Sequence, residues 1–221
     1  MGDWNRQITQ LNKCIIHVLY EKDNALHESN LIEENVFAQK EENAEYVCDG
    51  EKIHFGKDGR ISEIACQFEQ IATYKYGADG EPVYEQVESA NGTVTILKNA
   101  VKKFDKYMDQ VSVTFESSEE EMLFGLGQHE DGIYNYKGKQ QYLYQHNMKI
   151  SIPFILSTDN YGILIDTESS VRFNSDKTRT TFVIDAENKL SYYVILGDTF
   201  DEIIYNLRLL TGRASMLPRW A

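Results

Sequence analysis

Hydrophobic and polar residues alternate through most of this chain. Short runs rich in Val, Ile, Tyr, Phe and Thr are separated by polar turn sequences such as Asp49-Gly50 and Asn91-Gly92. This spacing puts apolar side chains on one face of a strand, and short turns join antiparallel neighbours. The expected strands cover residues 15–19, 51–55, 93–97, 111–115, 150–156, 161–165, 181–184 and 190–196. The pattern predicts an all-β protein in which two antiparallel sheets pack face to face.

One helix is expected near the C-terminus. Its apolar residues repeat at helical spacing, at Phe200, Ile203, Ile204, Leu207 and Leu210. Asp198 or Thr199 is expected to cap its N-terminus, and Gly212 its C-terminus. A second segment, residues 100–109, fits either a helix or a long polar hairpin.

Charge and composition narrow the classes of partner. The 221 residues contain 22 Lys and Arg against 35 Asp and Glu, which gives a formal net charge of −13. A nucleic-acid partner would require a basic face, so we expect none. No apolar run approaches the ~20 residues of a membrane-spanning helix, and the first residues lack the pattern of a signal peptide. The odd number of cysteines is typical of reduced thiols, which favours a cytoplasmic protein.

The acidic clusters are interpreted as solvated turns. Glu33-Glu34 and Glu119-Glu120-Glu121 could be imagined as catalytic carboxylate pairs. Neighbouring residues of a strand point to opposite faces, however, so adjacent carboxylates do not converge on one substrate. We therefore expect neither cluster to be catalytic.

The segment from Leu123 to Asn147 carries the most suggestive chemistry. Gly125 and Gly127 allow a sharp turn or a close approach, and tyrosines alternate with Asn and Gln in the residues that follow. Aromatic faces and neutral amides are suited to sugar rings and hydroxyls, although tyrosines at a spacing of two also fit the face of a sheet. His129 and His146 are candidate sugar contacts. No residues have the spacing of metal ligands, and we expect no metal or cofactor.

A series of motifs in the second half resembles one known family. The motifs are GLGQHEDG (125–132), NYKG (135–138), YQHN (144–147), IPFILST (152–158), YGILIDT (161–167), YYVILGDT (192–199) and LTGRASMLPRWA (210–221). Their order and spacing are similar to those of the N-terminal β-domain of glycoside hydrolase family 31. The variant found here resembles the branch that contains α-xylosidases and related bacterial α-glucosidases.

The resemblance implies a specific organisation. Residues 1–212 would form a galactose-mutarotase-like β-sandwich, and residues 213–221 would begin the linker to a (β/α)8 catalytic barrel that this sequence does not contain. Both catalytic aspartates of the retaining α-glycosidase would lie on the barrel, so no residue here is expected to be catalytic. The partners would be that barrel and an α-linked oligosaccharide. Apolar groups around Met216, Leu217 and Trp220 are expected to be left uncovered.

The resemblance also implies a substrate-facing loop. By its position, the segment 140–147 would lie over the mouth of the active site and shape the aglycone subsite, with Tyr144, Gln145, His146 and Asn147 as the binding residues. Two other functions compete with this one. A carbohydrate-binding module would stack sugar on Tyr134, Tyr136 or Tyr144, and an aldose mutarotase would need an acid–base pair such as His129-Glu130.

Overall fold

The computed structural model describes residues 4–22, 32, 46–56, 58–213 and 215–216. Within them the chain folds into two compact units, residues 1–68 with 110–221, and residues 69–109. The single domain expected over residues 1–212 contains parts of both. The elements are β1 (Trp4–Asn12), β2 (Ile15–Lys22), β3 (Tyr46–Asp49), β4 (Lys52–Phe55), β5 (Ile61–Ala78), β6 (Tyr84–Ser89), β7 (Gly92–Leu97), β8 (Ala100–Glu116), β9 (Leu123–Gln128), β10 (Gln140–Leu143), β11 (Ile150–Ser157), β12 (Tyr161–Ile165), β13 (Val171–Ser175), β14 (Arg179–Asp185), β15 (Lys189–Leu196) and α1 (Phe200–Thr211).

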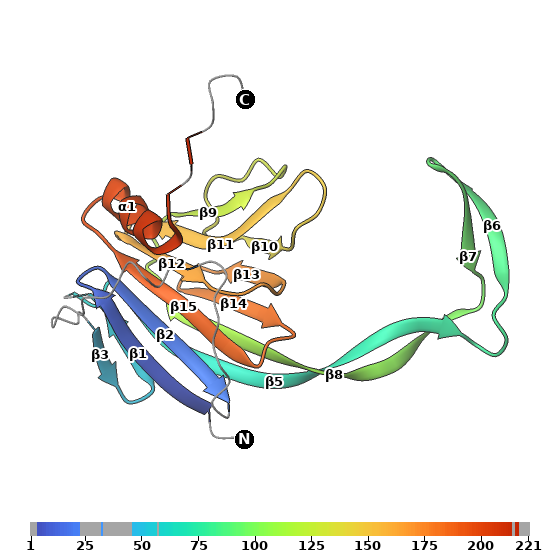
Figure 1. Ribbon diagram of the computed structural model, residues 1–221, viewed down its shortest axis with the longest axis horizontal. Coiled ribbons are helices and arrows are strands. Elements are labelled where there is room, and N and C mark those ends of the chain that lie inside the picture. The colour runs from blue at the N-terminus through green and yellow to red at the C-terminus, as the bar shows by residue number, and fades with distance from the viewer. Residues whose placement is uncertain (1–3, 23–31, 33–45, 57, 214, 217–221) are drawn as a thin grey trace. The chain divides into compact units, whose positions relative to one another are not determined.

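The first unit is a β-sandwich (Figure 1). In the described residues, a six-stranded sheet has the order β1-β2-β15-β12-β11-β9, and a seven-stranded sheet has the order β10-β13-β14-β8-β5-β4-β3. The strand pairs of both sheets run antiparallel, for example β12 with β15 and β13 with β14. The predicted antiparallel sandwich with a C-terminal helix is confirmed.

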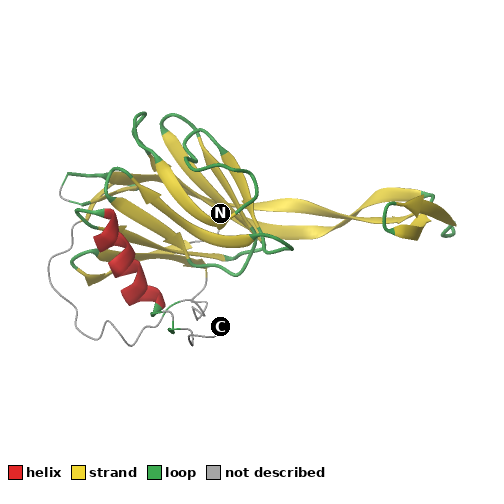
Figure 2. Cartoon of the chain, turned by 90° about the horizontal axis from the view of Figure 1, so that it is seen from above, coloured by secondary structure: helices red, strands yellow, loops and turns green. Residues whose placement is uncertain are grey.

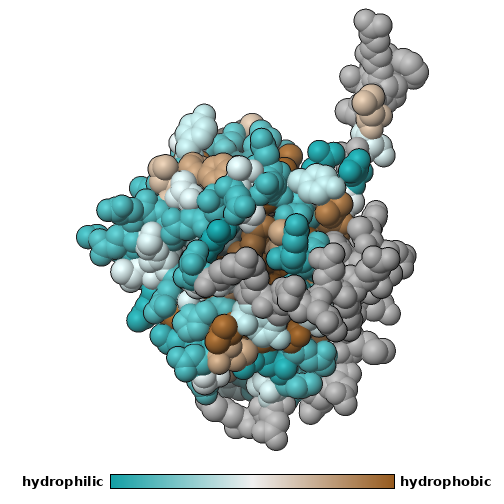
Figure 3. Space-filling model, turned by 90° about the vertical axis from the view of Figure 1, so that its left-hand side faces the viewer, coloured by the Kyte–Doolittle hydropathy of each residue, from teal (hydrophilic) through white to brown (hydrophobic). Residues whose placement is uncertain are grey.

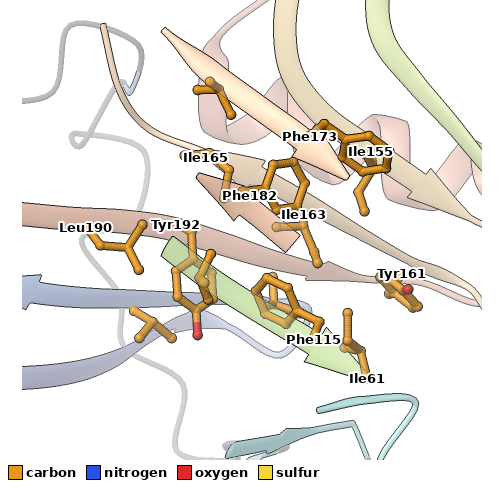
Figure 4. Packing of buried hydrophobic residues seen from close by; sticks show 14 of the residues in the cluster. Ile61, Phe115, Ile155, Tyr161, Ile163, Ile165, Phe173, Phe182, Leu190 and Tyr192 are labelled. Atoms are coloured by element: carbon orange, nitrogen blue, oxygen red, sulfur yellow. The ribbon is translucent and has the colours of Figure 1, made fainter. Parts of the chain in front are cut away.

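The main core lies between the two sheets. Phe115 of β8 and Tyr192 of β15 come from opposite sheets and meet edge to face, with ring centroids 5.4 Å apart. Figure 4 shows these rings among Ile163, Phe173 and Phe182, all of them fully or almost fully buried. Alternate residues of each strand supply this layer, which is why the period-two pattern found the strands.

A second apolar cluster lies on the outer face of the six-stranded sheet, where α1 packs (Figure 2). Ile203 and Leu210 of α1 are buried against Leu164 and Ile195, which alternate with the inward-facing residues of β12 and β15. Both faces of these two strands are therefore covered, and their sequences read as continuous apolar runs.

The ends of α1 agree with the sequence analysis. The Thr199 side chain accepts a hydrogen bond from the backbone N–H of Glu202, and Gly212 ends the helix with a φ of 82°. Beyond the helix, Met216 is 97% exposed, as expected for this segment. Leu217 and Trp220 lie outside the described residues. Apolar side chains also reach the surface in patches between hydrophilic ones on the side of the molecule drawn in Figure 3.

The second unit, residues 69–109, is a two-stranded ribbon. Parts of β5 and β8 form its base, and β6 and β7 form an antiparallel hairpin with the register Val87↔Val94. Residues 100–109 are part of a strand, so of the two alternatives for this segment the hairpin is right and the helix is wrong. All residues of this unit are described, and none of them is buried.

The expectation of a solvated acidic turn is wrong for Glu121. Its side chain is 3% exposed, and its carboxylate accepts hydrogen bonds from the Tyr161 hydroxyl at 2.5 Å, the Ser157 hydroxyl at 3.2 Å and the Ser118 N–H at 2.9 Å. These hydrogen bonds offset the free-energy cost of burying the carboxylate. The local sequence does not reveal them, because Ser157 and Tyr161 are distant in the chain. Glu119 and Glu120 are exposed, and Glu33 and Glu34 lie outside the described residues.

Candidate functional site

The predicted site residues lie on a loop that joins the two sheets. β10 is an edge strand of the seven-stranded sheet, and β11 belongs to the six-stranded sheet. Residues 144–149, called loop 144–149 below, connect these two strands (Figure 1). The loop therefore crosses from one sheet to the other.

The glycines of the GLG sequence shape the strand next to this loop. β9 pairs with β11, but the register shifts between Ser151 and Ile155, which marks a bulge. Gly125 and Gly127 have positive φ angles of 113° and 93°. A Cβ on Gly127 would lie 2.0 Å from the carbonyl oxygen of Ile150, so only glycine fits there. The GLG sequence thus allows the first residues of β11 to approach β9 closely.

Gln145 holds loop 144–149 closed. Its Nε2 donates a short hydrogen bond to the Lys149 carbonyl oxygen, and its Oε1 accepts one from the Ser151 N–H at 3.2 Å. The Ser151 hydroxyl donates to the Tyr144 carbonyl oxygen at 3.1 Å, and the Lys149 N–H donates to the His146 carbonyl oxygen at 3.2 Å. The Gln145 amide is used inside the loop, so its role is to fix the loop's shape.

Three rings form a ladder along the start of the loop. The ring centroids of Tyr142 and Tyr144 are 4.9 Å apart, and those of Tyr144 and His146 are 4.7 Å apart, with interplanar angles of 41° and 38°. Tyr142 and Tyr144 are about half exposed, and His146 is partly exposed. Asn147, the last predicted site residue, is exposed at the far end. The structure therefore brings Tyr144 and His146 together and adds Tyr142, which the sequence analysis did not select.

A small groove lies beside the ladder. Its volume is about 180 Å³, and residues of loop 144–149 and of the β12–β13 connection line it, among them Tyr144, Gln145, Ser151, Thr167, Glu168 and Ser169. The hydroxyls of Thr167 and Ser169 donate to Glu187 Oε1 at 2.8 and 3.3 Å, which fixes the far wall. No pattern in the sequence pointed to this wall. Ligand pockets usually measure about 300–1,000 Å³, so this groove by itself is smaller than a complete ligand site.

Two of the other candidate sugar contacts have structural roles, and the third is exposed. Both ring nitrogens of His129 are engaged, Nε2 with the Leu126 carbonyl oxygen at 2.8 Å and Nδ1 with Gln141 Nε2 at 3.2 Å. Tyr136 is only 3% exposed and packs edge to face on Phe173, so it cannot stack on a sugar. Tyr134 is 86% exposed. Of the three tyrosines proposed for a carbohydrate-binding module, Tyr136 is therefore excluded as a stacking surface. His129 is poorly placed for acid–base chemistry, because both of its ring nitrogens are already engaged.

Within the part of the chain that the structure describes, no three His, Cys, Asp or Glu residues lie close enough to hold a metal ion. Across the same residues, no helix is long and apolar enough to cross a membrane. Cys48 and Cys66 are described and carry free thiols.

Comparisons with known proteins agree on one group of enzymes. An α-xylosidase of Saccharolobus solfataricus is 38% identical over 179 residues, which cover 75% of this chain and 24% of that protein. A family 31 glucosidase of Pseudescherichia vulneris is 26% identical over 194 residues, covering 80% of this chain and 36% of its own. No protein-family profile matches the chain.

Solved structures show the same fold. A family 31 α-xylosidase from a soil metagenome, solved with xylose, superposes with a TM-score of 0.65 and 20% identity over 97% of this chain and 33% of its own. The chain thus spans about a quarter to a third of the length of these proteins. With the motifs of residues 125–221, these matches show that the chain belongs to glycoside hydrolase family 31, as the N-terminal β-domain of such an enzyme.

Proposed function

We propose that this chain is the non-catalytic β-domain of a retaining α-glycosidase that acts on α-linked xylosides or glucosides. In this proposal the domain supports a catalytic barrel, and loop 144–149 forms one wall of the aglycone subsite. The observation that carries it is the ladder of Tyr142, Tyr144 and His146 beside a groove too small to be a complete site.

The ladder has the chemistry that an aglycone wall needs. Half-exposed tyrosine rings offer apolar faces to the C–H groups of a sugar, while their hydroxyls and the imidazole can hydrogen-bond sugar hydroxyls. The internal hydrogen bonds of Gln145 hold the loop in one shape before substrate arrives, which lowers the entropy cost of binding. A second surface, supplied by a barrel, would close the groove.

The buried acids support a non-catalytic role. Retaining glycosidases use two carboxyl groups about 5–5.5 Å apart on either side of the scissile bond. The deeply buried carboxylates Glu63 and Glu121 each accept hydrogen bonds from tyrosine hydroxyls inside the fold. Glu63 is 1% exposed and Glu121 is 3% exposed, so neither acid can reach a substrate in this conformation.

The direct test is an assay of the chain by itself. Purified residues 1–221 should release no p-nitrophenol from p-nitrophenyl α-xyloside or α-glucoside above the blank, whereas the intact enzyme should. Activity that persists through repurification, and that disappears in a Glu121→Gln or Glu63→Gln variant, would show that the domain has its own catalytic pair. Binding of oligosaccharide by the isolated domain, lost in Tyr134→Ala and kept in Tyr144→Ala, would instead favour a carbohydrate-binding module.

A further inference from the structure

The ribbon formed by residues 69–109 carries a cluster of exposed aromatic rings, called the aromatic face below. Tyr74 and Phe104 meet edge to face across the two strands, with centroids 6.1 Å apart, and Tyr107 meets Phe104 at 5.1 Å. Lys102 places its Nζ 4.3 Å from the centre of the Tyr74 ring. The three rings are more than half exposed. Large apolar groups left open in this way usually mark an interaction surface.

Polar bonds join the same two strands beside these rings. Lys75 pairs with Asp105 at 2.7 Å, and the Thr73 hydroxyl donates to the Lys106 carbonyl oxygen at 2.9 Å. Lys103 Nζ donates to the Ala78 carbonyl oxygen at 2.5 Å. These bonds hold the two strands together, and they leave the rings of Tyr74, Phe104 and Tyr107 exposed to a partner.

The shape of the aromatic face favours a protein partner over a sugar. A pyranose ring stacks on a flat aromatic surface, but the interplanar angles here are 85° for Tyr74 with Phe104 and 61° for Phe104 with Tyr107. Rings set edge to face make a ridged surface. Side chains of another protein can fill the spaces between ridges, as they do in protein cores.

The hairpin at the far end of the ribbon carries a second apolar face. Val87 and Val94 are a cross-strand pair, and Ile96 lies on the same face as Val94 because it is two residues further along the strand. All three are exposed by about two-fifths. β-branched side chains of this kind fit between aromatic ridges.

Charge is segregated along the ribbon. We define the stem as residues 70–78 with 100–108, and the tip as residues 79–99. The stem has a net charge of +3, from Lys75, Lys102, Lys103 and Lys106 against Asp105, and the tip has a net charge of −3, from Asp79, Glu81, Glu85 and Glu88 against Lys98. Lys75–Asp105 and Lys98–Glu85 are ion pairs inside the ribbon. Three lysines of the stem and three carboxylates of the tip then remain to attract a partner.

We propose that the ribbon is a dimerisation element that pairs with the ribbon of a second copy of this chain, antiparallel about a two-fold axis. In such an interface the same surface is used twice, so the stem of each copy lies against the tip of the other. Stem lysines then face tip carboxylates at both ends, and the valines and isoleucine of the tip meet the aromatic ridges of the stem. A parallel arrangement would place like charges together, which is unfavourable.

The test is the association state of the full 221-residue chain by sedimentation velocity and light scattering. We expect a reversible dimer whose dissociation constant rises with salt, because exposed charges are screened. Reversal of the stem (Lys102→Glu with Lys106→Glu) or of the tip (Glu81→Lys with Glu88→Lys) should each weaken self-association about tenfold or more. All four side chains are exposed, so circular dichroism and the melting temperature should stay unchanged.

A mixture of the two reversed variants gives the decisive measurement. The stem-reversed chain carries two acidic ends and the tip-reversed chain two basic ends, so the antiparallel geometry predicts that they form a heterodimer although neither dimerises well alone. Lys139→Glu with Lys177→Glu, and Glu119→Lys with Glu120→Lys, change the net charge equally at exposed positions outside the ribbon and should leave the wild-type dimer intact.

Three outcomes would overturn the proposal. The first is a wild-type chain that stays monomeric up to about 1 mM, where even a millimolar dissociation constant would be seen. The second is a dimer that the ribbon variants do not weaken or that the mixture does not restore. The third is a monomer whose Tyr74 and Tyr107 resonances shift on addition of xylo- or gluco-oligosaccharide, which would make the aromatic face a sugar site.

Discussion

The Tyr161 hydroxyl donates a 2.5 Å hydrogen bond to Oε1 of Glu121, and both side chains are almost fully buried. Burial raises the pKa of Glu121, and the hydrogen bond from Tyr161 acts in the opposite direction. The pair fastens the start of β12 to the segment just before β9, the strand that flanks the candidate loop. The Ser157 hydroxyl donates to the same carboxylate oxygen at 3.2 Å.

Removal of the Tyr161 hydroxyl should destabilise the domain. In Tyr161→Phe the ring still packs, but the buried carboxylate loses one donor, and a hydrogen bond to a charged group contributes about 1.5–3 kcal/mol. We expect the free energy of unfolding in urea to fall by about that amount. Tyr205→Phe, at an exposed position on α1, is the matched control and should change it by less than ~0.5 kcal/mol. Equal effects of the two substitutions would mean that the Glu121 contact adds nothing to stability.

The second buried acid predicts a dependence of stability on pH. Glu63 accepts hydrogen bonds from the hydroxyls of Tyr20, at 2.5 Å, and Tyr192. Burial raises its pKa above the ordinary value of 4.5, and the two hydrogen bonds only partly offset this. The folded state therefore holds a proton that the unfolded state has lost between pH 4.5 and the raised pKa. The contribution of Glu63 to stability is fully present below pH 4.5 and is lost as the pH rises through that window.

The Glu63→Gln variant tests this sign. It cannot titrate at this position, so its free energy of unfolding should fall less steeply with rising pH than that of the wild type, by up to about 1.4 kcal/mol per pH unit. Urea unfolding at several pH values from 4.5 upward measures both slopes. Glu119→Gln, at an exposed position, is the control. A wild-type slope that matches the Glu63→Gln slope would show that Glu63 ionises alike in the folded and unfolded states.

The close approach of β11 to β9 at Gly127 gives a third prediction. Gly127→Ala should cost far more stability than Gly138→Ala. Both glycines have positive φ angles, for which a Cβ costs about 1–2 kcal/mol, but a Cβ at Gly138 meets open space. At Gly127 it would also collide with the backbone of β11, at 2.0 Å from the Ile150 carbonyl oxygen. Melting temperatures of the two variants measure the difference, and similar values would mean that β11 can move away from β9 at little cost.

Strands such as 111–115 and 181–184 were predictable because alternate residues of each are buried in the core. α1 carries its signals locally, in Thr199, Gly212 and the apolar spacing between them. The ribbon was not predicted as a separate unit, because none of its residues is buried and no one-sided burial marks its strands. For the same reason residues 100–109 fitted two secondary structures equally well.

The candidate site was predictable only in part. The alternation of Tyr142, Tyr144 and His146 is visible in the sequence and produces the ring ladder. The use of Gln145 inside the loop depends on Lys149 and Ser151, and the second wall of the groove comes from residues 167–170 in another connection. Glu121 was misplaced for a related reason, since its donors Ser157 and Tyr161 lie 36 and 40 residues away. Such tertiary partners leave no local pattern.

The last prediction concerns the intact enzyme. His146→Ala removes one rung of the ladder and Asn147→Ala removes an exposed amide beside it, and neither change touches the bonds by which Gln145 closes the loop. If loop 144–149 contacts the leaving-group sugar, each substitution should raise KM or change the preference among disaccharides by about tenfold, equivalent to ~1.4 kcal/mol. Hydrolysis of an aryl glycoside, whose leaving group makes no sugar contacts, should stay nearly unchanged.

Two comparisons separate contact with substrate from support of the fold. Asn91→Ala, at the exposed turn of the β6–β7 hairpin, removes the same kind of amide at a position far away in the sequence. It should change the hydrolysis of neither the disaccharide nor the aryl glycoside. Gln145→Ala should loosen the loop, so its reduced activity on disaccharides should be accompanied by a lower melting temperature. His146→Ala should not lower the melting temperature. Equal losses on disaccharide and aryl substrates in His146→Ala would mean that the loop supports the catalytic centre or the fold, because an aglycone contact acts only when an aglycone sugar is present.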